Sequence, residues 1–260
     1  MEPSIIQSWL TAWALTAPRI LVAFAVLPIL TDQIIPSGLR NGILLSLSLY
    51  VLPLTHEQFL NVNLSTIHLL ALVIKEGVLG LLIGYALSVP FWAIKATGFL
   101  IDMQRGVMSA LYFSHTTGNM VSPIGNFLSL LLTTLLLTSG GFMTLLQTLF
   151  LSYNTWPLDQ LTLSINAEVA TFFLKQLDML MYTTVLLAGP MIGIMFLTDF
   201  GAGLVGRYLP QLNIFLIAMP IKSGVAFFIL IFYIAFIADY MKDSFVKVSL
   251  VLPQLENLLR

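Results

Sequence analysis

The sequence predicts an all-α, polytopic membrane-type protein with about six long hydrophobic helices or helical hairpins. Of its 260 residues, 58% are hydrophobic and only 9% are charged, whereas a soluble domain carries roughly 45–50% apolar and about 25% charged residues. So few charges cannot coat a surface that faces water. The charges also divide the chain into apolar runs, most of which approach the length that a helix needs to cross a bilayer.

The same composition excludes several classes of function. Eleven basic residues face 12 acidic ones, for a net charge of −1, so the clustered basic residues that nucleic-acid binding requires are missing. The chain has no cysteine, which excludes a disulfide framework, a thiolate metal site and a cysteine nucleophile. We therefore expect neither a soluble enzyme nor a nucleic-acid-binding protein.

Helix boundaries follow from the positions of charged and turn-forming residues, because an ionised side chain is costly at the bilayer centre. The beginning of the chain lacks the basic region of a signal peptide, so we expect residue 1 to be kept in the mature protein. Connectors rich in Pro, Gly, Ser and Asn separate the first helices. The expected helical ranges are about 5–30, 39–53, 67–94, 124–153, 169–197 and 212–238.

Charged residues inside these helices predict that protein surrounds them, since such groups rarely face lipid. Neighbours on a helix point about 100° apart, so we expect Lys75 and Glu76 to pair with other helices or other chains and not with each other. Close helix packing is the other general expectation, because glycines four residues apart let backbones approach. The charges are Arg19, Lys75, Glu76, Asp178 and Lys222, and the glycine pairs are Gly38 with Gly42, Gly80 with Gly84 and Gly189 with Gly193.

The segment 95–123 differs from its neighbours. It begins as a helix that carries Asp102 and Arg105 three residues apart on one face. From Ser109 onward it is rich in Ser, Thr, Gly and Asn, which predicts a long loop. The two charges could form a proton or substrate relay, or a structural pair that pins a re-entrant segment, and the residues alone leave both interpretations open.

Basic residues occur in the first, third and fifth connectors and not in the second and fourth, which places the odd connectors in the cytoplasm. The basic residues of the tail, Lys242, Lys247 and Arg260, would then lie outside. Either the positive-inside rule is overridden here, or the helices are not inserted conventionally.

No catalytic constellation is found. The three histidines lack the spacing of a zinc peptidase, and Ser114 beside His115 lacks the G-x-S-x-G turn of a serine nucleophile. Three glycines near residue 203 lack the Lys-Ser or Lys-Thr of a phosphate-binding loop, so we expect a tight cytoplasmic turn there. The histidines are His56, His68 and His115, and the glycines are Gly201, Gly203 and Gly206.

Several stretches resemble one known family. The block KEGVLGLLIGYALSVPFWAIKATGFLIDMQRG at 75–106 and the block RYLPQLNIFLIAMPIKS at 207–223 resemble the type III secretion export apparatus proteins called FliR in flagella and SctT, YscT or SpaR in injectisomes. A-P-R-I at 17–20, L-R-N-G at 39–42 and S-G-G at 139–141 extend the resemblance over nearly the whole chain. The P-F-W and I-D-x-Q-R-G elements are closer to the injectisome, or virulence, branch.

The resemblance implies a non-enzymatic subunit of the export gate in the bacterial inner membrane, without a cofactor. One copy would join several copies of the FliP/SctR and FliQ/SctS types in a helical assembly, with residues 1–165 similar to the former partner and the hairpin 166–260 similar to the latter. The FlhB/SctU-type switch protein and the FlhA/SctV-type ring protein would be further partners. Unfolded proteins would be the cargo, with energy supplied elsewhere in the machine.

Two groups of residues receive roles from the resemblance. The first is a pore plug at about 106–122, where glycines give backbone freedom and bulky side chains fill a pore, although composition alone equally fits a surface loop. The second is a turn at the cytoplasmic entrance that meets the switch protein. The plug residues are Gly106, Met108, Tyr112, Phe113, Gly118 and Met120, and the turn residues are Arg207, Pro210, Gln211 and Asn213.

A different class of function competes with this interpretation. A proton-coupled transporter of small solutes would use intramembrane charges such as Lys75, Glu76, Asp102 and Arg105 around a binding site at the bilayer midplane. It would be a self-sufficient bundle with saturable uptake. A membrane-embedded hydrolase is the third alternative.

Overall fold

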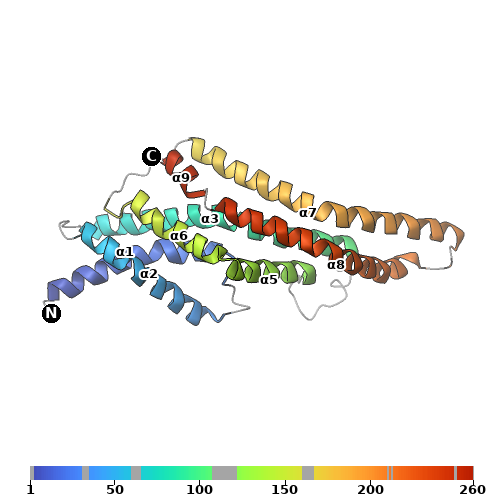
Figure 1. The fold of residues 1–260 in the computed structure, drawn as a ribbon, viewed down its shortest axis with the longest axis horizontal. Helices are drawn as coiled ribbons and strands as arrows, with labels where there is room; N and C mark the ends of the chain where they lie inside the picture. The colour runs from blue at the N-terminus through green and yellow to red at the C-terminus, as the bar shows by residue number, and fades with distance from the viewer. Residues whose placement is uncertain are drawn as a thin grey trace. The chain divides into compact units, whose positions relative to one another are not determined.

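The computed structural model describes residues 3–30, 35–59, 66–106, 122–159, 167–209, 211, 213–248 and 251–259. Every regular element within these ranges is a helix (Figure 1), which confirms the all-α fold class. The helices are α1 (Pro3–Val26), α2 (Ser37–Phe59), α3 (Thr66–Arg105), α5 (Pro123–Thr138), α6 (Gly141–Thr155), α7 (Ala167–Tyr208), α8 (Ile214–Val248) and α9 (Val251–Leu259).

Four of the described helices are long and apolar enough to cross a membrane, and α5 with α6 forms a fifth candidate if the pair crosses as one broken span. The candidate spans within α1, α3, α7 and α8 are Ser8–Val26, Thr66–Arg105, Glu168–Tyr208 and Leu216–Ser244. Helix α2 does not qualify, because its apolar run is short: Arg40 and Asn41 precede it, and His56, Glu57 and Gln58 follow it. A polytopic membrane protein is therefore the fold that these helices support.

Several expected helix boundaries are wrong. Helix α7 continues through Gly201, Gly203 and Gly206 to Tyr208, so these glycines do not form the tight turn that their spacing suggested. A glycine inside a helix costs only about 1 kcal/mol relative to alanine, and a lipid environment favours a backbone whose hydrogen bonds are all internal. The expected single helix 124–153 is instead broken at Gly140, whose φ of 77° is left-handed.

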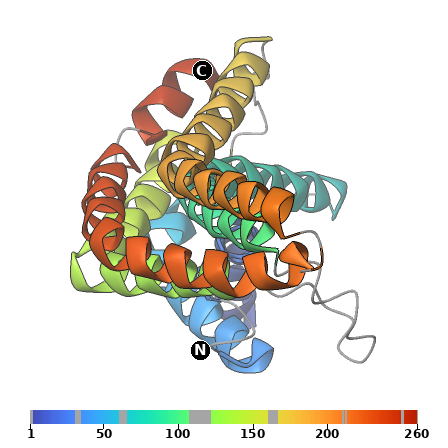
Figure 2. The ribbon, with the colours of Figure 1, turned by 90° about the vertical axis from the view of Figure 1, so that its right-hand side faces the viewer.

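The chain after α7 turns back sharply. Figures 1 and 2 show α8 returning from the end of α7, and an ion pair of 2.8 Å between Lys222 Nζ and Asp199 Oδ1 joins the two helices near the turn. Helix α8 extends to Val248, beyond the expected end at residue 238, and the short helix α9 after it was not expected.

The helices divide into two compact units. Unit 1 comprises Met1–Val89, Gly140–Gln176 and Phe245–Arg260, and unit 2 comprises Pro90–Ser139 and Leu177–Ser244. Helices α3, α7 and α8 run from one unit into the other. The predicted division into residues 1–165 and 166–260 rests on similarity to two partner proteins and not on compactness. It therefore stays a prediction.

Unit 1 contains a close contact between α1 and α3. A Cβ atom built on Gly80 would collide with the backbone of Arg19, and one built on Gly84 would lie 2.7 Å from the carbonyl oxygen of Ala23. The glycine pair of α3 therefore lets two helix backbones touch, as its spacing predicts. Helix α1 also packs against α2, and α6 packs against α9.

Unit 2 contains a similar glycine contact between α3 and α5. A Cβ atom on Gly98 would collide with the backbone of Gly125. Helix α7 joins the same contact region, because the hydroxyl of Thr184 donates to the carbonyl oxygen of Ala93 at 3.3 Å. The start of α5 is thus held against α3 by backbone contact.

Replacing Gly84 with valine should destabilise the protein by about 1–3 kcal/mol, because the new side chain must push α1 and α3 apart. The matched control is Gly193→Val in α7, since nothing lies within 4 Å of a Cβ atom at Gly193. Thermal unfolding of the full chain in detergent measures both. Equal stability of the two variants would show that the α1–α3 contact is not as tight as described.

Candidate functional site

Arg19 lies at the centre of a buried charge cluster in unit 1. Its side chain is fully buried, and its Nε atom lies 2.6 Å from Glu76 Oε2. One terminal nitrogen donates to Ser152 Oγ at 3.0 Å, and the other donates to the carbonyl oxygen of Trp156 at 2.9 Å. We call these four residues, with Lys75, the Arg19 cluster.

The glycine contact explains how the arginine reaches the carboxylate. Glu76 lies one turn before Gly80 on α3, and Gly80 touches the backbone of Arg19 itself. Helix α6 closes the remaining side, because the ring centroid of Tyr153 lies 4.0 Å from Arg19 Cζ. The hydroxyl of the same tyrosine donates to the carbonyl oxygen of Thr16 at 2.8 Å.

The expectation that Lys75 and Glu76 do not pair with each other is wrong. Lys75 Nζ lies 2.9 Å from Glu76 Oε1 and donates to the carbonyl oxygen of Pro157 at 2.8 Å. The long lysine side chain bends back far enough to reach its neighbour, while Glu76 also pairs with Arg19 on another helix. These charges thus find partners within the chain, and contacts from them to other subunits stay a prediction.

Asp102 organises a second cluster in unit 2. Its Oδ1 atom pairs with Arg105 of the next turn. Its Oδ2 atom accepts from Ser122 Oγ at 2.6 Å and from the backbone N–H of Ile124 at 2.9 Å. We call these four residues the Asp102 cluster. Asp102 and Arg105 are 1% and 4% exposed, so both charges are buried and paired.

Local sequence explains why the two helices end and begin here. Gly106 has a φ of 87° and donates its N–H to the carbonyl oxygen of Met103 at 3.0 Å, which ends α3. Ser122 is the N-cap of α5 and accepts from the N–H of Gly125 at 3.0 Å. Pro123 follows at the first helical position, where its missing N–H costs nothing.

The surroundings favour a pin over a proton relay for Asp102 and Arg105. An arginine does not release its proton in proteins, and the guanidinium is also covered by α8, with its Cζ atom 5.0 Å from the ring centroid of Phe227. Both carboxylate oxygens are already occupied by partners within the chain. The arrangement holds helices in place and offers no acid or base to a substrate.

A smaller polar contact joins three helices of unit 2. Lys222 pairs with Asp199, and Gln104 Nε2 donates to the second carboxylate oxygen of Asp199 at 3.4 Å. Sequence reasoning singled out Lys222 and missed Asp199, although an acidic residue inside an apolar run was a usable signal. It also missed Ser122, whose position before a proline is typical of a helix N-cap.

The tip of the α7–α8 hairpin presents polar groups to the outside. Arg207 in the last turn of α7, Gln211 and Asn213 are all exposed, while Pro210 lies outside the described residues. Of the plug residues, Gly106 ends α3. The other five, Met108, Tyr112, Phe113, Gly118 and Met120, lie outside the described residues.

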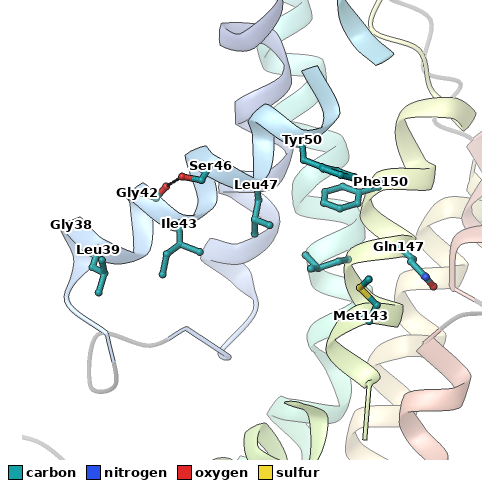
Figure 3. A pocket seen from close by; sticks show the side chains of 11 residues that line it. Gly38, Leu39, Gly42, Ile43, Ser46, Leu47, Tyr50, Met143, Gln147 and Phe150 are labelled. Carbon is teal, nitrogen blue, oxygen red and sulfur yellow. Dashed lines mark hydrogen bonds between the residues drawn. The ribbon is translucent and has the colours of Figure 1, made fainter. Parts of the chain in front are cut away.

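A groove in unit 1 separates α2 from α6 (Figure 3). Its volume is about 840 Å³, and its walls are mostly apolar. Tyr50 and Phe150 approach each other across it, with ring centroids 5.3 Å apart. Gly38 and Gly42 line it and have nothing within 4 Å of a built Cβ atom, so their face is not used by another helix of the described chain. The residues that line it include no acidic, basic or histidine side chain.

Comparison with known proteins points to one family. The model of the family described as bacterial export proteins, family 1, matches residues 10–248. Yop proteins translocation protein T of Yersinia pestis is 36% identical over 99% of this chain and 100% of its own length. Secretion system apparatus protein SsaT of Salmonella typhimurium is 32% identical, covering 84% and 85%. Flagellar biosynthetic protein FliR of Bacillus subtilis is 26% identical, covering 95% and 94%.

The Arg19 cluster predicts an asymmetry between its members, because two cations share one carboxylate. Glu76→Gln leaves Arg19 and Lys75 buried without the carboxylate that contacts both of them, which should cost about 3–5 kcal/mol. Arg19→Met leaves a balanced pair of Lys75 and Glu76 and should cost less. Thermal unfolding of each variant in detergent compares them. If Arg19→Met lowered the stability as much as Glu76→Gln, the charge balance would not determine the stability of the cluster.

Proposed function

The chain belongs to the bacterial export proteins of family 1, and we propose that it is a structural and gating subunit of the export gate of a type III secretion system. One observation carries this proposal: 36% identity to Yop proteins translocation protein T over the full length of both proteins. Identity to injectisome relatives is higher than the 26% and 25% to the flagellar relatives of Bacillus subtilis and Escherichia coli, which favours the injectisome branch.

The helices fit this role. With four described helices long and apolar enough to span a bilayer, the chain is a multi-pass protein of the bacterial inner membrane, within the base of the secretion system. The charges of the Arg19 and Asp102 clusters are buried and paired within the chain. Other charges in the same spans, among them Lys95 and Asp178, are exposed, so the expectation that protein surrounds Asp178 is not met within this chain. The chain passes unfolded proteins and catalyses no reaction in this proposal, and the energy comes from other components.

The proposed plug is the segment at about 106–122. Two described features support it, because Gly106 turns the chain out of α3 and Ser122 returns it into α5 beside the same carboxylate. The two described ends of the segment therefore lie near one side chain. The glycines and bulky side chains of the segment suit a stopper that fills a pore and moves when cargo arrives.

The proposed partners follow from the family. Subunits of the FliP/SctR and FliQ/SctS types complete the gate around one copy of this chain, and the FlhA/SctV-type ring lies beyond it. The FlhB/SctU-type switch protein meets the hairpin tip, where Arg207, Gln211 and Asn213 are exposed and offer hydrogen-bonding groups.

The solute-transporter alternative is not supported. The relatives reported above carry the names of secretion and flagellar proteins. The charges that a proton-coupled transporter would use are paired with groups within the chain, and one of them, Arg105, is an arginine that cannot pass a proton on. We therefore retain the export-gate function alone.

Isolation of the complex tests the function directly. The affinity-tagged chain, extracted from membranes in mild detergent, should co-purify in fixed stoichiometry with several copies of two small hydrophobic proteins. Mass spectrometry of the intact complex measures this. A chain that purifies alone and supports saturable uptake of a small solute in liposomes would contradict the proposal.

Replacing residues 107–121 by a short Gly-Ser linker should raise the ion conductance of the assembled complex, because a resting pore wide enough for a polypeptide loses its stopper. Assembly should be unchanged, since the packing helices on either side are kept. Planar-bilayer recordings of parent and variant complexes compare the two. An assembled variant as tight to ions as the parent would remove the plug from the proposal and leave the channel role intact.

A photo-crosslinking residue in place of Gln211 should capture the switch protein, because this position is exposed at the hairpin tip. The matched control is the same crosslinker at Gln147 of α6, which is also exposed but lies in unit 1. Immunoblotting of the adducts in intact cells reads the result. Capture of periplasmic proteins alone from position 211 would show that the orientation is inverted.

A further inference from the structure

Helix α7 carries an exposed carboxylate that has no counter-charge among the described residues. The side chain of Asp178 forms no ion pair or hydrogen bond with any residue that the structure describes. The 20 residues 179–198, which follow it, contain no charge, and this is about the length that a helix needs to cross a bilayer. Asp199 lies at the other end of this run and pairs with Lys222 of α8. Of the two flanking carboxylates, only Asp199 thus has a counter-charge within the described chain.

Two glycines lie on the same face of α7 as Asp178. Gly189 and Gly193 follow it by 11 and 15 residues, which is close to three and four full turns of a helix. A Cβ atom built on either glycine has nothing within 4 Å. Tyr182, one turn after Asp178, is 67% exposed. We call these four residues the α7 face, and no described residue packs closely against its glycines.

Glycines inside the other long helices show what such a face is used for. Gly80 and Gly84 let α3 touch α1, and Gly98 lets α3 touch α5. Without such a contact, a glycine in a helix is only less stable than an alanine. The open glycine pair of α7 therefore suits a helix that the described chain does not supply.

We propose that the α7 face binds a membrane-spanning helix of another subunit of the gate, and that this helix carries a lysine or arginine opposite Asp178. A helix packed here takes the carboxylate out of water, and a buried charge is stable only when it is paired. Because a helix rises 1.5 Å per residue, the basic residue should lie roughly 20 Å along the axis from the glycine contact. The inference rests on the proposed function and deepens it, because it states the chemistry of a partner.

Two simpler explanations of the exposed carboxylate make different predictions. Lys175 stands one turn earlier on α7 and could neutralise Asp178, although no ion pair between them is described. Lys175→Gln would then affect the protein as much as Asp178→Asn. Alternatively, the carboxylate could lie among lipid headgroups and water, and neither substitution would then affect assembly.

Three variants change the α7 face without removing a described contact. Asp178→Lys places a cation against the cation of the partner, so the two repel. Asp178→Asn removes the charge and keeps the shape. Gly193→Val adds bulk where the partner helix should come closest, and nothing in the described chain opposes it.

Three controls match these variants. Lys175→Gln tests the pair within α7. Asp239→Asn removes an exposed carboxylate from α8 that pairs with Lys242 of the same helix. Gly224→Val adds the same bulk to α8, at another glycine with nothing within 4 Å of a built Cβ atom.

The first measurement is the amount of each gate subunit that the affinity-tagged chain retains in mild detergent, determined by quantitative mass spectrometry. Asp178→Lys and Gly193→Val should lower the retention of at least one subunit roughly tenfold or more. Asp178→Asn should lower it less, and the three controls should match the parent. If the parent complex forms and Asp178→Lys and Gly193→Val keep its stoichiometry, the docking role is refuted and the export-gate function stands. A parent chain that purifies alone would overturn both.

Thermal unfolding of the isolated chains separates docking from folding. Asp178→Lys and Gly193→Val should unfold at the temperature of the parent, because both positions are exposed in the chain alone. A lower temperature would show that the α7 face packs within its own chain, which would also refute the docking role.

Photo-crosslinking identifies what covers the α7 face. A photo-crosslinking residue in place of Tyr182 should form an adduct with a gate subunit, at a helix that carries lysine or arginine. Replacing that basic residue with aspartate should restore the complex of Asp178→Lys and not that of Gly193→Val, because the exchange returns opposite charges to the contact. An adduct with a second copy of this chain or with lipid alone would overturn the proposal, and so would a charge exchange that fails to restore assembly.

Discussion

The ion pair between Arg19 and Glu76 determines how unit 1 is assembled. An arginine inside an apolar span would cost at least about 2.5–3.5 kcal/mol if it faced lipid without a partner. Most of the groups around Arg19 either pair with it or bury it. Glu76 supplies the counter-charge at 2.6 Å, and a hydroxyl and a carbonyl oxygen from the region of α6 each accept a hydrogen bond from one terminal nitrogen of Arg19. Gly80 is required because only a residue without a side chain lets α3 come near enough to the backbone of α1. One buried charge therefore fixes the relative positions of three helices in this unit.

Unit 2 also has a buried charge at its centre, but this charge is negative. Its central buried group is a carboxylate, Asp102, which is neutralised by Arg105 and completed by hydrogen-bond donors at the start of α5. Here too a glycine contact, between Gly98 and Gly125, brings the backbones together. Both clusters lie where a glycine lets the backbones of two helices touch. Paired charges at helix crossings provide rigid points in such a structure, and this is why we assign them a structural role in the proposed gate.

Composition and charge spacing were sufficient to predict an all-α membrane fold, and the motifs around residues 75–106 were sufficient to predict the family. The spacing of Gly80 and Gly84 also allowed a prediction, because residues four apart lie on the same face of a helix and small ones let another helix approach. The partners of the charges could not be predicted, since Arg19 and Glu76 lie 57 residues apart and local spacing rules cover only three or four. The continuation of α7 through Gly201 was missed because glycine is a weak signal for a turn in an apolar environment. The break at Gly140 was missed for the opposite reason, since the apolar run continues across it.

Secretion by the bacterium that makes this chain tests its central role most directly. We would delete the gene, then restore it from a plasmid, and measure the proteins that appear in the culture medium under conditions that induce type III secretion. If the chain is a subunit of the channel, the medium of the deletion strain should contain none of the secreted substrates, while the cells still synthesise them, and the plasmid should restore their release. Normal release of the same substrates without this chain would contradict its assignment to the export gate.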